Sequence, residues 1–321
     1  MSRDRAATYW IGRVAALLLG AVLLVAAWAK VLDPLAFAEQ ISREGLDLVL
    51  PARWVAVVAI ALEIGLGLAL MLGLRRLWIL VPTGLMIVLF LFLTGRAYWL
   101  WANGMLDEAA ACGCFGNLVE RTPAEAFWQD ALMLVPLYLL SFLGRAPSGD
   151  RRGGRWRVVV TAVAVVAGVI FTWLSPSLPL DDLATRLSPG TEISSLCAGA
   201  GDEADRICLD VLLPPLADGD HWVVLAGLEE EALRSGVEAL NRLALEGDVD
   251  GVWVLSADPP EVHQAFFWQV GPVFEVREVP LALIRPLYRT TPRSFRLEDG
   301  MVTRTVSGLP PPAHGDESPA E

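Results

Sequence analysis

Charged residues are scarce in this chain of 321 residues: they make up 19% of it, whereas 54% of it is hydrophobic. This composition excludes an ordinary soluble domain, because the apolar residues are also concentrated in long runs. Lysine occurs once, as Lys30, and the three histidines (His221, His263 and His314) all lie in the C-terminal part. No Gly-rich phosphate loop, Cys-x-x-Cys-His motif or Ser/His/Asp arrangement is visible, which argues against nucleotide, haem and hydrolase chemistry.

Five apolar runs approach the roughly 20 residues that a helix needs to cross a bilayer. In hydrocarbon every backbone polar group must pair internally, so such runs predict helices. The sequence therefore predicts a multi-pass α-helical membrane bundle. The runs cover Ile11–Ala29, Ala52–Leu72, Leu77–Leu100, Phe127–Leu143 and Trp156–Leu174.

Cationic residues are distributed unevenly between the loops. Loops on the side of the N-terminus hold ten arginines, and the opposite loops hold four cationic residues. The positive-inside rule then predicts a cytoplasmic N-terminus in the inner (plasma) membrane. The loop after the third run and all residues after Leu174 would face the periplasm or exoplasm. All four cysteines lie on that side, where disulfides form and persist. The first run ends in Ala27-Trp28-Ala29, which resembles a signal-peptidase site, but its length favours a retained helix.

The charge balance changes sharply after the fifth run. Residues 1–174 hold 15 Lys+Arg and 12 Asp+Glu, whereas residues 175–321 hold 10 and 25. This acidic balance argues against binding nucleic acid or anionic lipid headgroups. We therefore predict a four-helix membrane domain (1–145), a basic loop with a fifth transmembrane helix (146–174), an exoplasmic acidic α/β domain (175–308) and a disordered Pro-rich tail (309–321).

Within the acidic part the hydrophobic period alternates between that of strands and that of helices. This order resembles the thioredoxin-like fold, in which an X-Pro dipeptide precedes a terminal hairpin, as Thr291-Pro292 does here. The dithiol of that fold is missing, because Gly227-Leu228-Glu229-Glu230 occupies its place. The predicted elements are strands at 221–226 and 251–255, helices at 230–245 and 260–270, and a hairpin of 294–297 with 301–306.

Cys112-Gly113-Cys114 lies in the loop after the third apolar run and is the most informative motif. With one residue between them, the two thiols can close only a small, strained ring, which predicts a labile, oxidising disulfide. The same thiols can ligate a soft metal ion, but no histidine lies nearby. An inert structural disulfide is the third reading. Cys197 and Cys208 are interpreted as a structural disulfide, which short-loop closure favours, or as a relay that exchanges electrons with Cys112 and Cys114. The remaining alternative is free thiols or intermolecular pairing.

Two ionisable residues fall within or near the apolar runs. Intramembrane charges are costly and are usually paired in the bundle interior, so Glu63 and Arg96 are candidates for a pair. The alternative is that the long side chain of Arg96 reaches the outer interface. Glu63 either anchors helix packing or lines a cavity for a proton path or a quinone, the one cofactor that the sequence suggests. Lys30, at the outer end of the first run, is interpreted as an interfacial anchor.

Three elements resemble the DoxX-like superfamily, and within it the MauE branch of methylamine utilisation proteins. They are Ala29-Lys30-Val31-Leu32-Asp33-Pro34, Leu62-Glu63-Ile64-Gly65-Leu66-Gly67, and Cys112-Gly113-Cys114-Phe115-Gly116. The resemblance implies a four-helix membrane bundle and a role in making or delivering disulfides to exported proteins. Its partner would be an exported client or a periplasmic thiol–disulfide protein. Alternatives are a non-catalytic scaffold whose thioredoxin-like tail binds a client, and a soft-metal transporter or chaperone.

Overall fold

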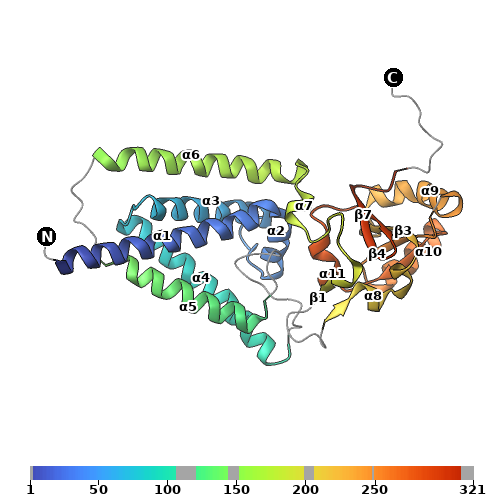
Figure 1. The fold of residues 1–321 in the computed structure, drawn as a ribbon, viewed down its shortest axis with the longest axis horizontal. Coiled ribbons are helices and arrows are strands. Elements are labelled where there is room, and N and C mark those ends of the chain that lie inside the picture. The colour runs from blue at the N-terminus through green and yellow to red at the C-terminus, as the bar shows by residue number, and fades with distance from the viewer. Residues whose placement is uncertain (1–2, 106–120, 144–151, 199–205, 248, 312–321) are drawn as a thin grey trace, which may run out of the picture. The chain divides into compact units, whose positions relative to one another are not determined.

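A computed structural model describes residues 3–105, 121–143, 152–198, 206–247 and 249–311. The chain divides into two compact units, Met1–Leu180 and Asp181–Glu321. The first unit is helical and the second is α/β (Figure 1). This confirms the predicted fold class, a helical membrane bundle followed by a small α/β part. The finer division into four segments stays a prediction.

Among its described residues, the first unit has one long helix at each of the five apolar runs. It adds one short helix, α2, which the apolar pattern did not predict. Asp33 caps α2 by accepting a hydrogen bond from the Ala36 amide, and Pro34 occupies its first turn. The helices are α1 (Arg3–Leu32), α2 (Pro34–Arg43), α3 (Ala52–Met71), α4 (Leu77–Ala102), α5 (Pro123–Ser141) and α6 (Arg152–Leu174).

Four helices in the described part of the chain are long and apolar enough to cross a membrane. They provide the segments Ala6–Leu32, Ala52–Met71, Leu77–Ala102 and Arg155–Ser177. The chain is therefore a multi-pass membrane protein. Helix α5, at the predicted run Phe127–Leu143, is not among the four; it carries Glu125 and Asp130. A fifth crossing is thus not confirmed, and the predicted topology stays a prediction.

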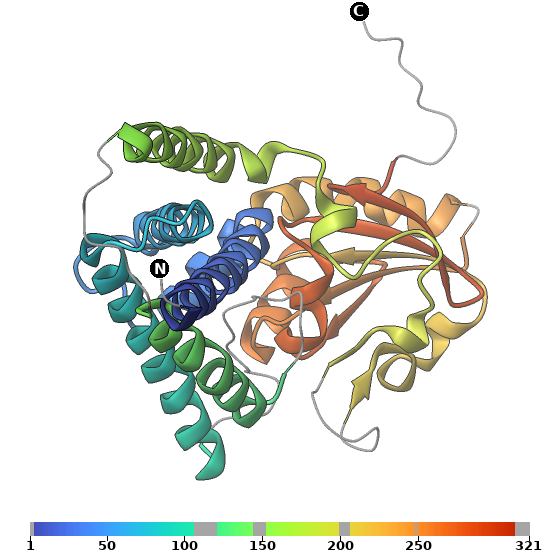
Figure 2. The same cartoon turned by 60° about the vertical axis from the view of Figure 1, so that its left-hand side comes forward.

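Helix α1 is the centre of the bundle, because it packs against α3 on one side and α5 on the other (Figure 2). Its contact with α3 depends on glycine: a Cβ at Gly20 would lie 2.5 Å from the Gly67 carbonyl oxygen. Such small residues let two helix backbones approach closely in a membrane. Helix α4 completes the bundle against α5, and α6 packs mainly against α3, with most of its surface exposed.

The second unit contains a five-stranded mixed sheet in the order β5-β4-β3-β6-β7. Strand β3 pairs in parallel with β4, and β4 with β5, whereas β6 and β7 form an antiparallel hairpin beside β3. The order β4-β3-β6-β7 and these directions define the thioredoxin-like fold and confirm that prediction. The main strands are β3 (Asp220–Leu225), β4 (Gly251–Ser256), β5 (Glu275–Glu278), β6 (Arg293–Glu298) and β7 (Met301–Ser307).

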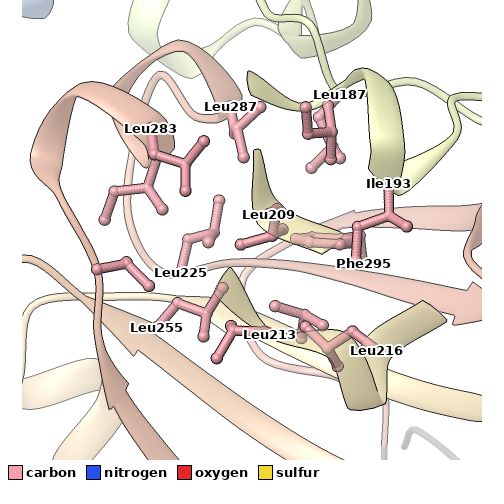
Figure 3. Close-up of a cluster of buried hydrophobic side chains, with 14 of the residues drawn as sticks. Leu187, Ile193, Leu209, Leu213, Leu216, Leu225, Leu255, Leu283, Leu287 and Phe295 are labelled. Atoms are coloured by element: carbon pink, nitrogen blue, oxygen red, sulfur yellow. The ribbon is translucent and has the colours of Figure 1, made fainter. Parts of the chain in front are cut away.

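The sheet has an apolar layer on each face, because successive side chains of a strand point to opposite sides. Trp222 and Val224 of β3 pack under α9 (Glu231–Glu246) and α10 (Pro260–Val270). Val223 and Leu225 belong to the other layer, part of which Figure 3 shows. Short elements cover that layer: α8 (Leu209–Leu212), α11 (Leu281–Ile284), the two-stranded pair β1 (Cys197–Ala198) and β2 (Ile207–Cys208), and the single turns η4 (Ile193–Ser195), η6 (Pro214–Ala217) and η7 (Arg285–Leu287). The unit begins with α7 (Asp181–Ala184).

A buried arginine ties the start of this unit to its sheet. The Arg293 guanidinium, 1% exposed, donates hydrogen bonds to Thr185 Oγ1 (2.6 Å), Leu187 O (3.1 Å) and Leu287 O (2.9 Å). Burial lowers the pKa of Arg293, and the nearby carboxylates of Asp181 and Asp182 oppose that effect. The segment before β1 is therefore part of the folded unit rather than a loose linker.

Candidate functional site

The Cys112 and Cys114 pair lies outside the described residues, so its predicted role is untested. The structure does describe where the chain re-enters the bundle after them. Thr122 and Glu125 form a capping box at the start of α5, with Thr122 Oγ1 accepting from the Glu125 amide at 3.2 Å and Glu125 Oε2 accepting from the Thr122 amide at 3.0 Å.

Next to that cap lies a buried ion pair that the sequence analysis missed. Arg121 Nη1 is 3.5 Å from Asp130 Oδ1, and both side chains are at most 8% exposed. Asp130 lies within an apolar run, which was the one available signal. Separating the two residues would leave a buried charge without its partner, which is costly. The pair therefore holds the start of α5 in place.

Cys197 and Cys208 form a disulfide in the α/β unit. They lie directly opposite each other in β1 and β2, with 3.9 Å between their Cα atoms. The sequence predicted that they would pair, and the structure joins them. The choice between a structural and a relay role stays a prediction.

The place of the missing dithiol is occupied by a carboxylate. Glu230 Oε1 accepts hydrogen bonds from the Gly227 amide (3.0 Å) and the Thr291 hydroxyl (2.5 Å). The Leu228 amide donates to Asp258 Oδ2 at 2.7 Å. Thr291 precedes Pro292 through a cis peptide bond, as in the fold that the sequence resembles. The backbone amides of Gly227 and Leu228, just before α9, thus donate to carboxylates. No thiol is present among Gly227–Glu230.

In the membrane unit, Glu63 pairs with Lys30 and not with Arg96. Lys30 Nζ lies 2.5 Å from Glu63 Oε1, and the two side chains are 2% and 0% exposed. Arg96 instead pairs with Glu44 at 2.5 Å, near the surface. The expected Glu63–Arg96 pair is therefore wrong, and so is the interpretation of Lys30 as an interfacial anchor. Helix α1 continues to Leu32, which carries Lys30 into the interior of the bundle.

The ammonium group of Lys30 is otherwise surrounded by aromatic rings. It lies 5.2 Å from the ring centroid of Phe37 and 5.1 Å from that of Phe90. Within the described residues, Glu63 Oε2 is buried and accepts no hydrogen bond. The pair is therefore fully desolvated but only partly satisfied, an arrangement that is uncommon in protein interiors.

A pocket of about 100 Å³ opens beside this pair, between α2, α3 and α4. Its wall is mostly apolar, and the polar groups that reach it come from Lys30, Gln40, Glu44 and Thr94. It combines features typical of small-molecule sites, a largely apolar wall and a few polar groups. The other lining residues are Phe37, Ile41, Leu46, Val55, Ala59, Leu89, Phe90 and Leu93.

The sites fall into separate units: Glu63 with its pocket belongs to the membrane bundle, and the Cys197–Cys208 disulfide belongs to the α/β unit. In the part of the chain that the structure describes, no group of three or more His, Cys, Asp or Glu residues is arranged to hold a metal ion. The described residues thus offer three features to explain: a disulfide, a carboxylate in the thioredoxin position and a polar group in an apolar pocket.

The fold and these sites define a multi-pass membrane protein that carries a thioredoxin-like unit without its dithiol. Residues 8–143 match the sequence model of the MauE family, described as methylamine utilisation protein MauE. This match confirms the resemblance seen in the membrane part of the sequence. No curated protein matches the chain. A crystal structure assigned as a thiol:disulfide interchange protein DsbE from Chlorobium tepidum is similar over 39% of this chain and 89% of its own, with 17% identity and a TM-score of 0.31.

Proposed function

We propose that this protein is a thiol–disulfide redox protein of the inner (plasma) membrane that assists disulfide formation in, or electron transfer to, exported proteins. In this proposal the N-terminus is cytoplasmic, and the α/β unit and the Cys112/Cys114 loop face the periplasm or exoplasm. The partner is an exported client or a periplasmic thiol–disulfide protein.

The observation that carries the proposal is the composition of the thioredoxin-like unit. Its fold is suited to thiol–disulfide partners, yet Glu230 lies where a dithiol would act and its own two cysteines are already paired. We therefore assign exchange with the client to Cys112 and Cys114. The Cys197–Cys208 disulfide is then either structural or an electron relay to that pair, and the α/β unit holds the partner.

A client thiolate attacks one sulfur of the oxidised Cys112–Cys114 pair, which forms a mixed disulfide and releases the other sulfur as a thiolate. A second client thiolate then displaces the pair. The client gains a disulfide and loses two electrons, and the pair returns to two thiols. An oxidant must afterwards remove those two electrons.

The test is disulfide trapping in membranes that contain the full chain. With Cys114→Ser, the remaining Cys112 should accumulate a mixed disulfide with a client, detectable by mass spectrometry after alkylation. The matched control is Cys197→Ser with Cys208→Ser, which should leave exchange at Cys112/Cys114 intact if that second disulfide is structural. Unreactive Cys112 and Cys114 under both oxidising and reducing growth would refute the proposal.

One observation favours a second function, a non-catalytic scaffold. Phe267 and Trp268 on α10 are 54% and 78% exposed and stack edge-to-face, which provides an apolar surface for a bound protein. A scaffold predicts that Cys112→Ser with Cys114→Ser leaves client maturation unchanged, whereas Trp268→Ala weakens it.

A further inference from the structure

The pocket beside Lys30 combines a desolvated cation with apolar and aromatic walls. Lys30 is 3% exposed and has three N–H donors, of which Glu63 accepts one. Within the described residues it makes no second hydrogen bond. Because the ammonium lines the pocket, its remaining donors are available to an acceptor on a bound molecule.

Charge restricts what that acceptor can be. Lys30 and Glu63 together are neutral, so an anionic ligand would place an uncompensated charge beside the buried Glu63 carboxylate. A cation would be repelled by Lys30. A neutral molecule with a carbonyl oxygen is the acceptor that costs least to desolvate here. The side-chain amide of Gln40, also in the wall, supplies a second polar group.

Size and access restrict it further. The volume of about 100 Å³ is smaller than the apolar cavity of about 150 Å³ that is known to hold benzene, so the pocket takes at most a single ring, with its substituents left in the open mouth. Leu46 lines the pocket, and the chain continues into Leu48 and Val49, which are 90% and 91% exposed. Apolar side chains this exposed in a membrane protein are suited to contact lipid, which is where a ligand dissolved in the bilayer would approach the pocket.

We propose that this pocket binds the ring of a membrane quinone, with Lys30 donating a hydrogen bond to one carbonyl and the Phe37 and Phe90 rings flanking the head group. The role of this quinone as an electron acceptor rests on the proposed function. A reduced dithiol gives up two electrons and two protons when it becomes a disulfide, and a quinone that takes up both becomes a quinol. Lys30 and Glu63 position the carbonyl.

The location in the bundle agrees with that role. Lys30 lies near the end of α1, Val55 and Ala59 near the start of α3, and Leu93 and Thr94 in the last third of α4. The end of α1, the start of α3 and the end of α4 lie at the same end of the bundle if successive long helices alternate in direction. It is the end from which the chain leaves α4 toward Cys112 and Cys114.

The single lysine gives a direct measurement. Full-length protein labelled with ¹³Cε-lysine and placed in phosphatidylcholine nanodiscs has one lysine signal, that of Lys30. Titration with decylubiquinone should shift this signal saturably. Decylbenzene, which has a ring and tail but no carbonyls, should shift it less. An equal shift with decylbenzene, or no shift with decylubiquinone, would overturn the assignment.

Two variants on α3 separate pocket binding from general effects. Ala59→Phe fills the pocket and should abolish the shift, whereas Val58→Phe places the same side chain at a position that is 50% exposed and should leave the shift unchanged. If Ala59→Phe still responds as the unmodified protein does, the ligand lies elsewhere and the proposal is wrong.

A third variant tests the hydrogen bond without leaving a buried charge. Lys30→Met with Glu63→Leu replaces the pair by apolar side chains. Quinone should then raise the thermal stability of the protein less, with an affinity weaker by about tenfold or more. An unchanged affinity would refute the role of Lys30.

Quinone binding and disulfide exchange can be tested separately. Cys112→Ser with Cys114→Ser should bind decylubiquinone like the unmodified protein while losing disulfide exchange. Retained quinone binding without any exchange in the unmodified protein would reject the proposed function but keep the pocket. Disulfide exchange without quinone binding would reject the quinone pocket but keep the proposed function.

Discussion

The ion pair of Lys30 and Glu63 should show strong energetic coupling, because each group is buried and each is the charged partner of the other. The two side chains are 2% and 0% exposed, and their charged atoms are 2.5 Å apart. Removing one partner leaves the other charge in the bundle without compensation, at a cost of about 3–5 kcal/mol. Removing both leaves no charge, so the double replacement should recover most of that loss.

The assay is a double-mutant cycle on detergent-solubilised full-length protein, followed by thermal unfolding. Lys30→Met and Glu63→Leu should each lower the midpoint on the order of 10 °C, and the double variant should lie well above either. Arg96→Met is the matched control: it breaks a pair whose arginine is 45% exposed, so it should change the midpoint by only a degree or two. If the two single effects simply add, the pair is not coupled and this reasoning is wrong.

Three further predictions concern the α/β unit. Cys197→Ser with Cys208→Ser should lower the free energy of unfolding by about 3 kcal/mol, and adding a reductant to the unmodified chain should lower it by a similar amount. If denaturant unfolding of the unmodified chain does not respond to reductant, this prediction is wrong. Arg293→Met should cost about 3 kcal/mol because two buried carbonyl oxygens and the half-buried Thr185 hydroxyl lose their donor, whereas the exposed Arg277 of β5 should tolerate the same change. Equal effects would show that burial is not the cause. Gly227→Cys with Glu230→Cys should form a disulfide, because the Glu230 amide donates to Gly227 O at 3.1 Å and this turn brings the two positions within bridging distance. With dithiothreitol present to reduce that disulfide, the variant should catalyse insulin reduction. Two free thiols under oxidising conditions would show that the turn does not match the fold's redox site.

The elements that the sequence predicted best are those with a clear hydrophobic period. The helix at 260–270 begins and ends where the structure has α10, and the strand at 251–255 is β4 with one residue added. Strand β5 was missed because Glu275–Glu278 has three exposed side chains and lies at the edge of the sheet, where burial imposes no pattern.

The site was less predictable than the fold, because pairing depends on which helix faces which. The sequence identified Glu63 as an intramembrane carboxylate but assigned it to the wrong cation. Lys30 is three residues before Asp33, which looks like a helix end in the sequence. In the structure α1 reaches Leu32, and the ammonium turns inward to a carboxylate on another helix. Spacing along the chain contains no information about that choice.

The carboxylate at the thioredoxin position has a consequence for how the protein meets oxidative stress. Peroxides disable proteins of this fold by overoxidising an exposed active-site thiolate. The face around Glu230 is made of a carboxylate, a hydroxyl and backbone amides, which such oxidants leave unchanged. A partner would therefore find the same surface before and after an oxidant burst.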